Sequence, residues 1–270
     1  METEVIRAQA GNRQALATIV EGIQGKVYEL ALRMLGHPSD AEDAAQEILI
    51  KVITRMGSFR GESAFYTWVY RIAANHLLTT RQRKIEQMGL SFEVFEEGIE
   101  RQGTARETAS PEQHLLVDEL RSNCMQAILV CLNRDLRLAF VLGDIFGVTG
   151  VEGAFILDIT PAAFRQRLSR GRTRVRRFMK KNCGLIDPQN PCQCTRQLPS
   201  DVKKGWIDPK HPAYAGRIFF APVGKGLEDR MANLNDLQRI ATLFDTYPPR
   251  RPPEAFAPMV KRLLATPGHP

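Results

Sequence analysis

The stretch SFRGESAFYTWVYRIAANHLLTTRQRK, residues 58–84, places aromatic side chains beside a run of arginines. On a helix that begins near Ser63, the side chains of Phe65, Trp68 and Ile72 share one apolar stripe, so they are expected in a core. Four further side chains fall off that stripe or precede the helix: Tyr66, Tyr70, Asn75 and Phe59. Rings that a core leaves free can stack on unpaired bases while arginines hold phosphates. The stretch therefore predicts either capture of a nucleic-acid strand or a surface helix decorated with tyrosines.

The sequence before this stretch has helical spacing of apolar residues between 13 and 53, with one interruption at GHPSDAED (36–43). Ser39 is expected to cap the helix that follows, with Glu42 completing a capping box, and this helix is expected from about Asp40 to Met56. One of its faces carries Asp43, Gln46, Glu47 and Ile50, an acidic face with one aliphatic residue inside it. That face either docks on a basic partner helix or is solvated, with its first-turn acids stabilised by the helix dipole.

After residue 86 the sequence becomes acidic and polar with no sustained period, which predicts a flexible linker over 87–111. Helical spacing returns over 112–181, with short turns expected at Asn133, Gly147 and Asp158. A second helical domain is therefore expected after the linker.

The segment GVTGVEGAFILDITPAAFRQRLSRGRTRVRRFMKK (147–181) predicts a helix-turn-helix. Thr149 is expected to cap its first helix, and Thr160 to cap a recognition helix over Pro161–Phe178. The inward positions of that helix are Phe164 and Leu168, and the outward ones are Arg165, Gln166, Ser169 and Arg170. Further arginines and lysines follow and can supply phosphate binding, although a solvated basic helix is the alternative.

The composition of the chain limits the kinds of partner, location and activity that are expected. The chain has 270 residues and a formal net charge of +7, which favours nucleic acid as a partner but also fits an anionic membrane surface or an acidic substrate. No apolar run approaches the ~20 residues of a membrane helix, and the amino terminus lacks a targeting pattern, so a soluble cytoplasmic protein without membrane insertion is expected. The histidines are scattered and no nucleophile-base pair or phosphate loop is apparent, which argues against an enzyme.

The residues from 183 onward are rich in proline, glycine and scattered aromatics. They predict an irregular extension with one or two helices, over Leu227–Asp245 and around Met259–Leu264. Its cysteines leave three alternatives: zinc or another thiophilic metal, a redox-responsive thiol cluster, or structural thiols. The candidate ligands are Cys183, Cys192, Cys194 and the later His211.

The other two cysteines of the chain, Cys124 and Cys131, lie seven apart in a helical pattern. This spacing suits one buried helical face better than a disulfide, so reduced thiols are the default.

Four segments in this order, SDAEDAAQEILIKV, SFRGESAFYTWVYRIAANHLL, SPEQHLLVDELR and the helix-turn-helix, resemble an extracytoplasmic-function (group IV, sigma-70 family) sigma factor of bacterial RNA polymerase. The resemblance covers about Ala15 to Lys181. It implies an all-α protein with sigma region two over 1–86, a linker over 87–111, sigma region four over 112–182, and here an added extension over 183–270 that is expected to be regulatory. The implied partners are the beta-prime clamp helices and beta flap of core RNA polymerase, promoter DNA and an anti-sigma factor.

The resemblance also implies roles for individual residues. Those that would bind the clamp helices are Asp40, Asp43, Gln46 and Glu47. Those that would meet the minus-ten element are Phe59, Phe65, Tyr66, Trp68, Tyr70, Arg71 and Asn75, with Phe59 and Asn75 lining the pocket for a flipped-out base. Those on the helix that would read the minus-thirty-five element are Arg165, Gln166, Arg167, Ser169 and Arg170, of which Arg167 is expected to be partly structural.

Gly150 and Gly153 depart from the family pattern, and a helical glycine costs roughly 1 kcal/mol relative to alanine. Weaker DNA binding by this half, or binding that needs the polymerase to hold it in place, is therefore expected. The Leu227–Asp245 stripe is expected to pack on region two or four and to modulate access to polymerase or promoter.

The sequence as a whole predicts a factor that binds core polymerase, recognises the promoter and helps to melt it, with no catalysis and no required cofactor. A helix-turn-helix regulator that acts without polymerase is the first alternative, and an enzyme with a thiol or metal centre in the extension is the second.

Overall fold

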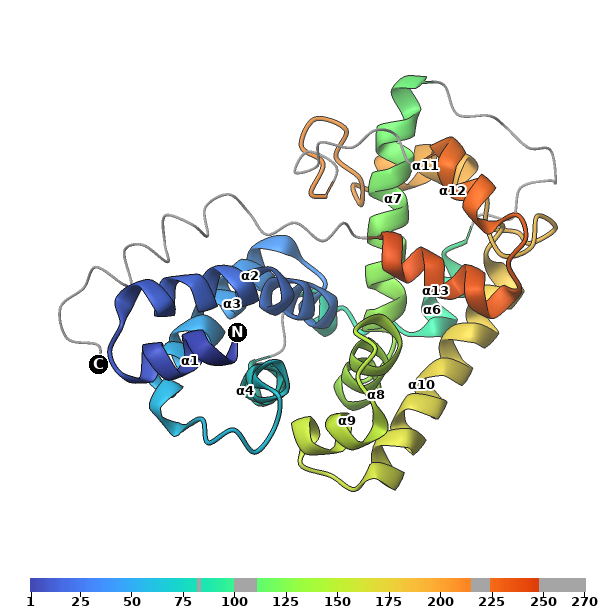
Figure 1. Ribbon diagram of the computed structural model, residues 1–270. Helices are drawn as coiled ribbons and strands as arrows, with labels where there is room; N and C mark the ends of the chain where they lie inside the picture. The colour runs from blue at the N-terminus through green and yellow to red at the C-terminus, as the bar shows by residue number, and fades with distance from the viewer. Residues whose placement is uncertain (82–83, 100–110, 215–223, 248–270) are drawn as a thin grey trace. The chain divides into compact units, whose positions relative to one another are not determined.

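The computed structural model describes residues 1–81, 84–99, 111–214 and 224–247 of the chain (Figure 1). In these ranges the regular structure is helical, and the one backbone bridge outside the helices joins Cys183 to Cys192. The all-α prediction is confirmed. None of the helices described is both long and apolar enough to cross a membrane. The predicted helix around Met259–Leu264 lies outside the described residues.

Contacts divide the chain into two units. The first groups Met1–Arg83 with Val148–Gln166, and the second groups Lys84–Gly147 with Arg167–Pro249. The helices of the first unit are α1 (Glu2–Gln9), α2 (Arg13–Leu35), α3 (Pro38–Thr54), α4 (Phe65–Thr79) and α9 (Gly150–Leu157). Its core contains the fully buried side chains Ile19, Ile23, Leu30, Ile48, Leu49 and Leu77.

The start of α3 corrects the predicted cap. The N-cap is His37, whose ring nitrogen accepts from the Ser39 backbone N–H at 3.3 Å, and Ser39 lies inside the helix. Pro38 takes the first helical position because its fixed φ suits that site and its missing N–H would have no helical partner there. The Ser39–Glu42 capping box was therefore wrong by two residues.

The second unit contains α5 (Lys84–Gln87), α6 (Phe92–Glu97), α7 (Pro111–Val130), α8 (Arg134–Phe140), the π-helical turn η2 (Val141–Ile145), the larger part of α10 (Pro161–Asn182), α11 (Cys194–Lys203), α12 (Gly224–Met231) and α13 (Asp236–Thr246). The turns predicted at Asn133, Gly147 and Asp158 are confirmed. Asn133 caps α8 by accepting from the Leu136 backbone N–H at 3.0 Å. The recognition helix runs four residues beyond its predicted end at Phe178.

Part of the predicted linker is structured. Ser91 caps α6, and Phe92 and Phe95 place their rings 5.3 and 5.1 Å from the ring of Phe178 on α10. Lys181 of α10 forms an ion pair with a glutamate at the end of α6, Glu96. Sequence reasoning missed this docking because α6 is too short to show a helical period.

A buried ion cluster anchors the segment just before α6. The Glu86 side chain is only 5% exposed and accepts from Arg134 at 2.6 and 3.0 Å and from Arg137 at 3.0 Å. Arg137 is itself buried and also donates to three backbone carbonyls that end α7, those of Leu129, Val130 and Leu132. Glu86 therefore joins α5 to the α7–α8 junction.

The described part of the extension belongs to the second unit and contains a helix in addition to those predicted. Leu198 of α11 and Ile207 join Val117 and Leu120 of α7 in one buried cluster, and Figure 1 shows α11 beside α7. The α11 helix was not predicted, because Pro199 and the mixed polar composition hide its period.

The helix predicted over Leu227–Asp245 is two helices. Asn235 and Gln238 form a reciprocal capping box that starts α13 anew, four residues after α12 ends. The Phe244 ring of α13 meets Phe140 at 5.3 Å. The Tyr247 hydroxyl after α13 donates to Asp118 of α7 at 2.7 Å. This stripe therefore packs on the predicted region-four helices, and its regulatory role stays a prediction.

Candidate nucleic-acid interface

A compact aromatic cluster stands where the sequence predicts one, at the start of α4. The Phe59 ring lies 5.4 Å from the rings of both Phe65 and Trp68, and those two are 5.7 Å apart. Phe65 is buried, whereas Phe59 and Trp68 are half-buried. Phe65 thus belongs to the core as predicted. Trp68 was also predicted in the core but is only half-buried, so it and Phe59 each keep an accessible part.

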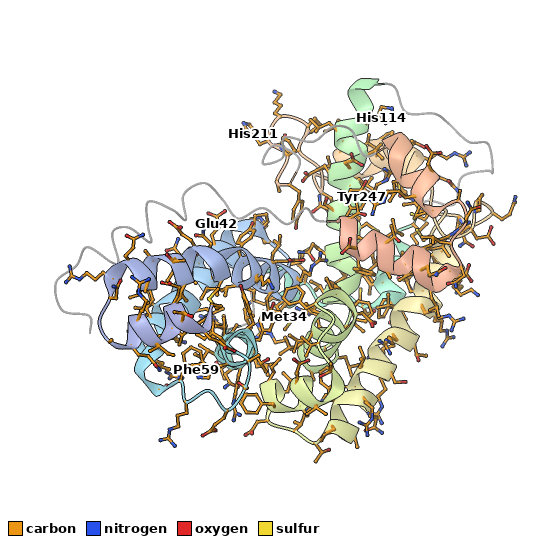
Figure 2. The ribbon with its side chains drawn as sticks, viewed as in Figure 1. Met34, Glu42, Phe59, His114, His211 and Tyr247 are labelled. Atoms are coloured by element: carbon orange, nitrogen blue, oxygen red, sulfur yellow. The ribbon has the colours of Figure 1, made fainter. Side chains whose placement is uncertain are left out.

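The loop that carries Phe59 is held by α1. The side-chain amide of Gln9 donates to the carbonyl oxygens of Met56 at 3.1 Å and Phe59 at 2.8 Å. Gly61 adopts a φ of 72°, which turns the chain back toward α4. Figure 2 shows Phe59 in this loop. The position of the ring is therefore fixed by backbone contacts as well as by its aromatic neighbours.

Tyr70 was predicted off the core stripe and is instead buried, 8% exposed. Within the first unit α4 contacts α2, α3 and α9, so more than one of its faces is covered. Burial, with the nearby Glu29 carboxylate, raises the pKa of Tyr70 well above its usual value. Tyr70 is a core residue here and is withdrawn from the candidate base-stacking set.

The remaining minus-ten candidates differ in their surroundings. Tyr66 is half-buried, and the Lys26 ammonium lies 4.1 Å from its ring centre. Asn75 is exposed. Arg71 is half-buried, pairs with Asp158 at 3.1 Å and stacks on Phe155 at 4.8 Å, both within the first unit.

The polar face of α3 lies opposite its core-facing alanines. Asp43 and Glu47 are exposed, and Asp40 and Gln46 are half-buried. The nearby exposed aliphatic side chain is Ile50. The Glu47 carboxylate lies 3.7 Å from the imidazole of His76, whose other nitrogen is 2.6 Å from the Lys51 ammonium. The structure thus presents this acidic face on the outer surface of α3.

The first helix of the helix-turn-helix has the predicted cap. Thr149 accepts from the Glu152 backbone N–H at 3.3 Å, and the Glu152 carboxylate accepts from the Thr149 backbone N–H at 2.9 Å. The Thr149 hydroxyl also donates to this carboxylate at 2.7 Å, and this bond, together with the one from the Thr149 backbone N–H, lowers the pKa of Glu152. Asp158 ends the helix in the left-handed region with φ 55°, and Thr160 accepts from the Ala163 N–H to start α10. The turn therefore begins with the left-handed backbone of Asp158 and ends with the side-chain cap of Thr160.

The outward side of α10 is arranged as predicted. Phe164 and Leu168 are buried, and the exposed side chains are Arg165, Gln166, Ser169 and Arg170. Arg167 is half-buried and pairs with Asp135 of α8 at 3.0 Å, so it is partly structural. Further along the helix, the Arg172 Nε–H donates to the Asp144 carboxylate at 2.8 Å.

The two unusual glycines of α9 have different surroundings. A Cβ built on Gly153 would lie 2.3 Å from ring carbons of Phe164, whereas one on Gly150 would meet Arg165 Cγ at an ordinary 3.7 Å. Gly153 is therefore required by the close approach of α10, and the propensity cost expected from the sequence is offset by this packing.

We expect Gly153→Ala to destabilise the helix-turn-helix by about 1–3 kcal/mol, because the phenyl ring must shift. Gly150→Ala is expected to be neutral or to stabilise by up to about 1 kcal/mol, since the methyl has room and alanine favours the helix. Urea unfolding of both variants followed by circular dichroism measures the difference. Equal stabilities would contradict the packing argument.

The group of residues around the predicted metal ligands differs from the prediction, because Cys124 joins it and His211 lies outside it. All five cysteines are free, and Cys124 of α7 lines the same small cavity as Cys183, Cys192 and Cys194. His211 is instead exposed and bonds Asp208 at 3.1 Å. Sequence reasoning grouped Cys124 with Cys131, and only the folded chain shows their different neighbours.

The buried thiols are poorly suited to react with oxidants. Burial raises the pKa of the Cys183 thiol to about 12 and raises that of Cys124 well above its usual value. Because the thiolate is the nucleophile, protonated thiols of this kind react slowly. Both the redox alternative and the metal alternative stay predictions.

Comparisons with known proteins place the chain in a family. The Sigma-70 region 2 family model matches residues 19–84. The RNA polymerase sigma-H factor of Pseudomonas aeruginosa is 34% identical over 171 residues, which are 62% of this chain and 88% of the relative. The ECF RNA polymerase sigma-E factor of Escherichia coli is 36% identical over 172 residues, with the same coverage. A solved Bartonella quintana sigma factor RpoE, in complex with the anti-sigma factor NepR, aligns with a TM-score of 0.41 at 21% identity over 60% of this chain and 95% of that one.

The matched length includes most of each curated relative, and the identity is above 30%. The helical fold, the aromatic helix α4 and the capped helix-turn-helix agree with that match. The chain therefore belongs to the extracytoplasmic-function family of RNA polymerase sigma factors, which bind core RNA polymerase and direct promoter-specific initiation of transcription.

Proposed function

We propose that this sigma factor uses three separate surfaces to bind core polymerase, an unpaired promoter base and duplex DNA. The acidic face of α3 docks on a basic surface of core polymerase, the Phe59 loop and Asn75 hold an unpaired promoter base, and the outer side of α10 reads duplex DNA. The observation that carries the proposal is that α3 and α10 each bury one side while presenting the side chains that such contacts need.

The minus-ten contact is supported by the half-buried Phe59 ring next to Trp68 and by the exposed amide on the same helix, Asn75. A base that leaves the duplex needs a ring to stack on and donors or acceptors for its edge. Tyr66 can extend the stacking surface. Tyr70 takes no part because it is buried.

The minus-thirty-five contact is supported by α10. Arginine pairs with guanine edges and glutamine with adenine edges in a major groove. Arg165, Gln166 and Arg170 are exposed on this helix and can make such contacts, and Ser169 can bond either a base or a phosphate. Arg167 contributes by fixing α10 to α8 through Asp135. We also propose that the protein acts in the cytoplasm and contributes no catalytic chemistry of its own.

Charge reversal on α3 tests the docking face. Asp43 and Glu47 are exposed and one turn apart, so Asp43→Arg with Glu47→Arg replaces a complementary surface by a repulsive one. Affinity for purified core polymerase is expected to fall by about 10- to 100-fold, with a weaker dependence on salt. Titration of fluorescent sigma factor with core polymerase at two salt concentrations measures both quantities.

Glu21→Arg, an exposed change on α2, is the matched control and is expected to keep the wild-type affinity. If the double reversal also binds core polymerase normally, the α3 face is not the docking surface.

A further inference from the structure

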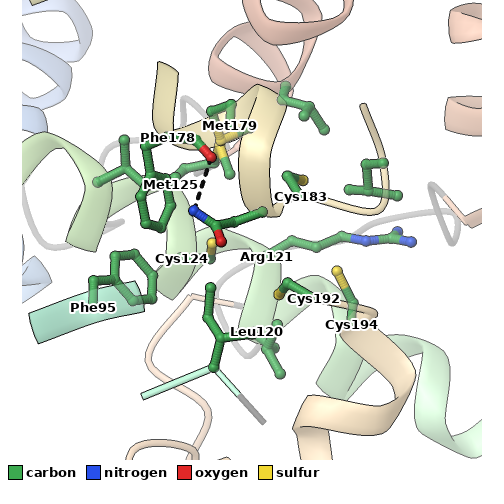
Figure 3. Close-up of a pocket in the computed structure, with 15 residues that line it drawn as sticks. Phe95, Leu120, Arg121, Cys124, Met125, Phe178, Met179, Cys183, Cys192 and Cys194 are labelled. Atoms are coloured by element: carbon green, nitrogen blue, oxygen red, sulfur yellow. Dashed lines mark hydrogen bonds between the residues drawn. The ribbon is translucent and has the colours of Figure 1, made fainter. Parts of the chain in front are cut away.

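Four cysteines from separate segments converge on one small cavity in the second unit (Figure 3). Cys124 comes from the middle of α7, Cys183 follows α10, Cys192 lies in the next loop and Cys194 begins α11. The cavity holds about 30 Å³, room for one water-sized particle, and most of its other lining is apolar. Thiols gathered around a space of that size are a donor set for a soft metal ion.

The backbone holds two of these cysteines side by side. The Gly184 N–H donates to the Cys192 carbonyl at 2.9 Å, and the Cys192 N–H donates to the Asn182 carbonyl at 3.0 Å, which makes the bridge between Cys183 and Cys192. The Asn190 side chain closes the loop by donating to the Cys183 carbonyl at 3.0 Å. Backbone and side-chain hydrogen bonds thus hold this loop in place.

A buried arginine beside the thiols lacks one hydrogen-bond partner within the described part of the chain. Arg121 also lines the cavity and is 8% exposed, and its Nε–H finds no acceptor among the described residues. One terminal nitrogen of the Arg121 guanidinium pairs with the Asp118 carboxylate at 3.1 Å. A buried N–H without an acceptor costs about 1–3 kcal/mol, and a nearby thiolate would satisfy it.

We propose that Cys124, Cys183, Cys192 and Cys194 bind one Zn²⁺ as a closed tetrathiolate site. Four thiols release four protons to solvent, four Zn–S bonds form, and the resulting net charge of −2 is partly balanced by the Arg121 guanidinium. This assignment replaces the His211 of the sequence-based set by Cys124, because the His211 side chain is 83% exposed and its nitrogen bonds Asp208.

The sulfurs are not yet at ligand distances. Among the described residues no three cysteine, histidine or acidic side chains already stand in a metal-binding arrangement. Cysteine has a single side-chain torsion, and the proposal requires that a change of this torsion bring each sulfur to the ion while the backbone stays in place. The site therefore closes around the ion as it enters, and it cross-links the start of the extension to α7.

Cobalt titration of the full chain is the direct test, because Co²⁺ takes zinc sites and its spectrum reports the ligands. The reduced, chelator-treated protein is expected to bind one equivalent of Co²⁺ with the thiolate charge-transfer and visible bands of a tetrahedral sulfur site. One equivalent of Zn²⁺ is expected to displace it. If the reduced wild-type chain binds no stoichiometric Co²⁺ or Zn²⁺, the proposal is wrong.

Serine variants identify the ligands. Cys124→Ser, Cys183→Ser, Cys192→Ser and Cys194→Ser are each expected to weaken Zn²⁺ binding by on the order of 100-fold or more. Cys131→Ser is the matched control: it is on the same stretch of chain as Cys124 but does not line the cavity, so it is expected to bind as wild type. Circular dichroism of each apo variant separates lost ligation from lost folding.

One result would overturn the ligand set even if zinc binds. If His211→Ala abolishes the site while Cys124→Ser keeps it, the ion is held by the extension alone. A Cys131→Ser variant that loses as much affinity as Cys124→Ser would equally contradict the four-cysteine assignment.

Discussion

Promoter-dependent runoff transcripts made by core polymerase with the Phe59→Ala, Asn75→Ala double variant are expected to fall by about 100-fold or more. Loss of a base-stacking ring costs roughly 1–3 kcal/mol, and each 1.4 kcal/mol is a factor of ten. Phe59 is half-buried against Trp68, and Asn75 is exposed, so the two changes remove a ring and an amide from the proposed base pocket. Affinity for core polymerase is expected to stay normal, because α3 is untouched.

Two comparisons keep this result interpretable. Asn75→Ala alone alters an exposed side chain and tests the pocket without loss of ring packing. Asn233→Ala removes an exposed asparagine between α12 and α13 and is expected to transcribe as wild type. Full transcription from the double variant on a duplex promoter would rule out the pocket, whereas loss of core binding would point to misfolding.

Glu86→Gln is expected to release the docked linker segment. The substitution keeps the shape of the side chain but leaves Arg134 and the buried Arg137 without their anion, and breaking a buried pair in this way costs about 3–5 kcal/mol. Amide hydrogen exchange over residues 84–99 is therefore expected to accelerate by on the order of 10²–10³-fold. Mass spectrometry of deuterium uptake measures it segment by segment.

Glu97→Gln, at the exposed end of α6, supplies the control and is expected to leave exchange unchanged. Unchanged protection of 84–99 in Glu86→Gln would mean that the aromatic contacts with Phe178 alone hold the segment, and the ion cluster would then have no role in docking.

Local structure could be predicted from the sequence where a single residue determines the backbone conformation. The caps at Thr149 and Thr160 and the buried positions of Phe164 and Leu168 follow from short-range rules, and all are confirmed. The acidic face of α3 and the exposed side of α10 were also predictable, because helical periodicity separates outer from inner positions.

What the sequence could not give depends on tertiary contacts. Tyr70 lies off the stripe of α4, but a helix covered on more than one face buries more than one stripe. Gly153 was expected to weaken the first helix of the helix-turn-helix, and only the folded chain shows that the Phe164 ring leaves no room for a larger side chain there. Cys124 is far from the other cavity cysteines along the chain, and α6 is too short for a periodic signal.

The docking of α5 and α6 also limits how far the chain can stretch. Between the end of α4 at Thr79 and the anchor at Glu86 lie residues 80–85, whose extended contour is only about 20–25 Å. If the docked segment detaches, residues 80–110 connect α4 to α7, and their fully extended length is about 100–110 Å. A ligand or substitution that loosens Glu86 is therefore expected to lengthen this stretch of chain while the side chains on the outer faces of α3 and α10 stay as they are.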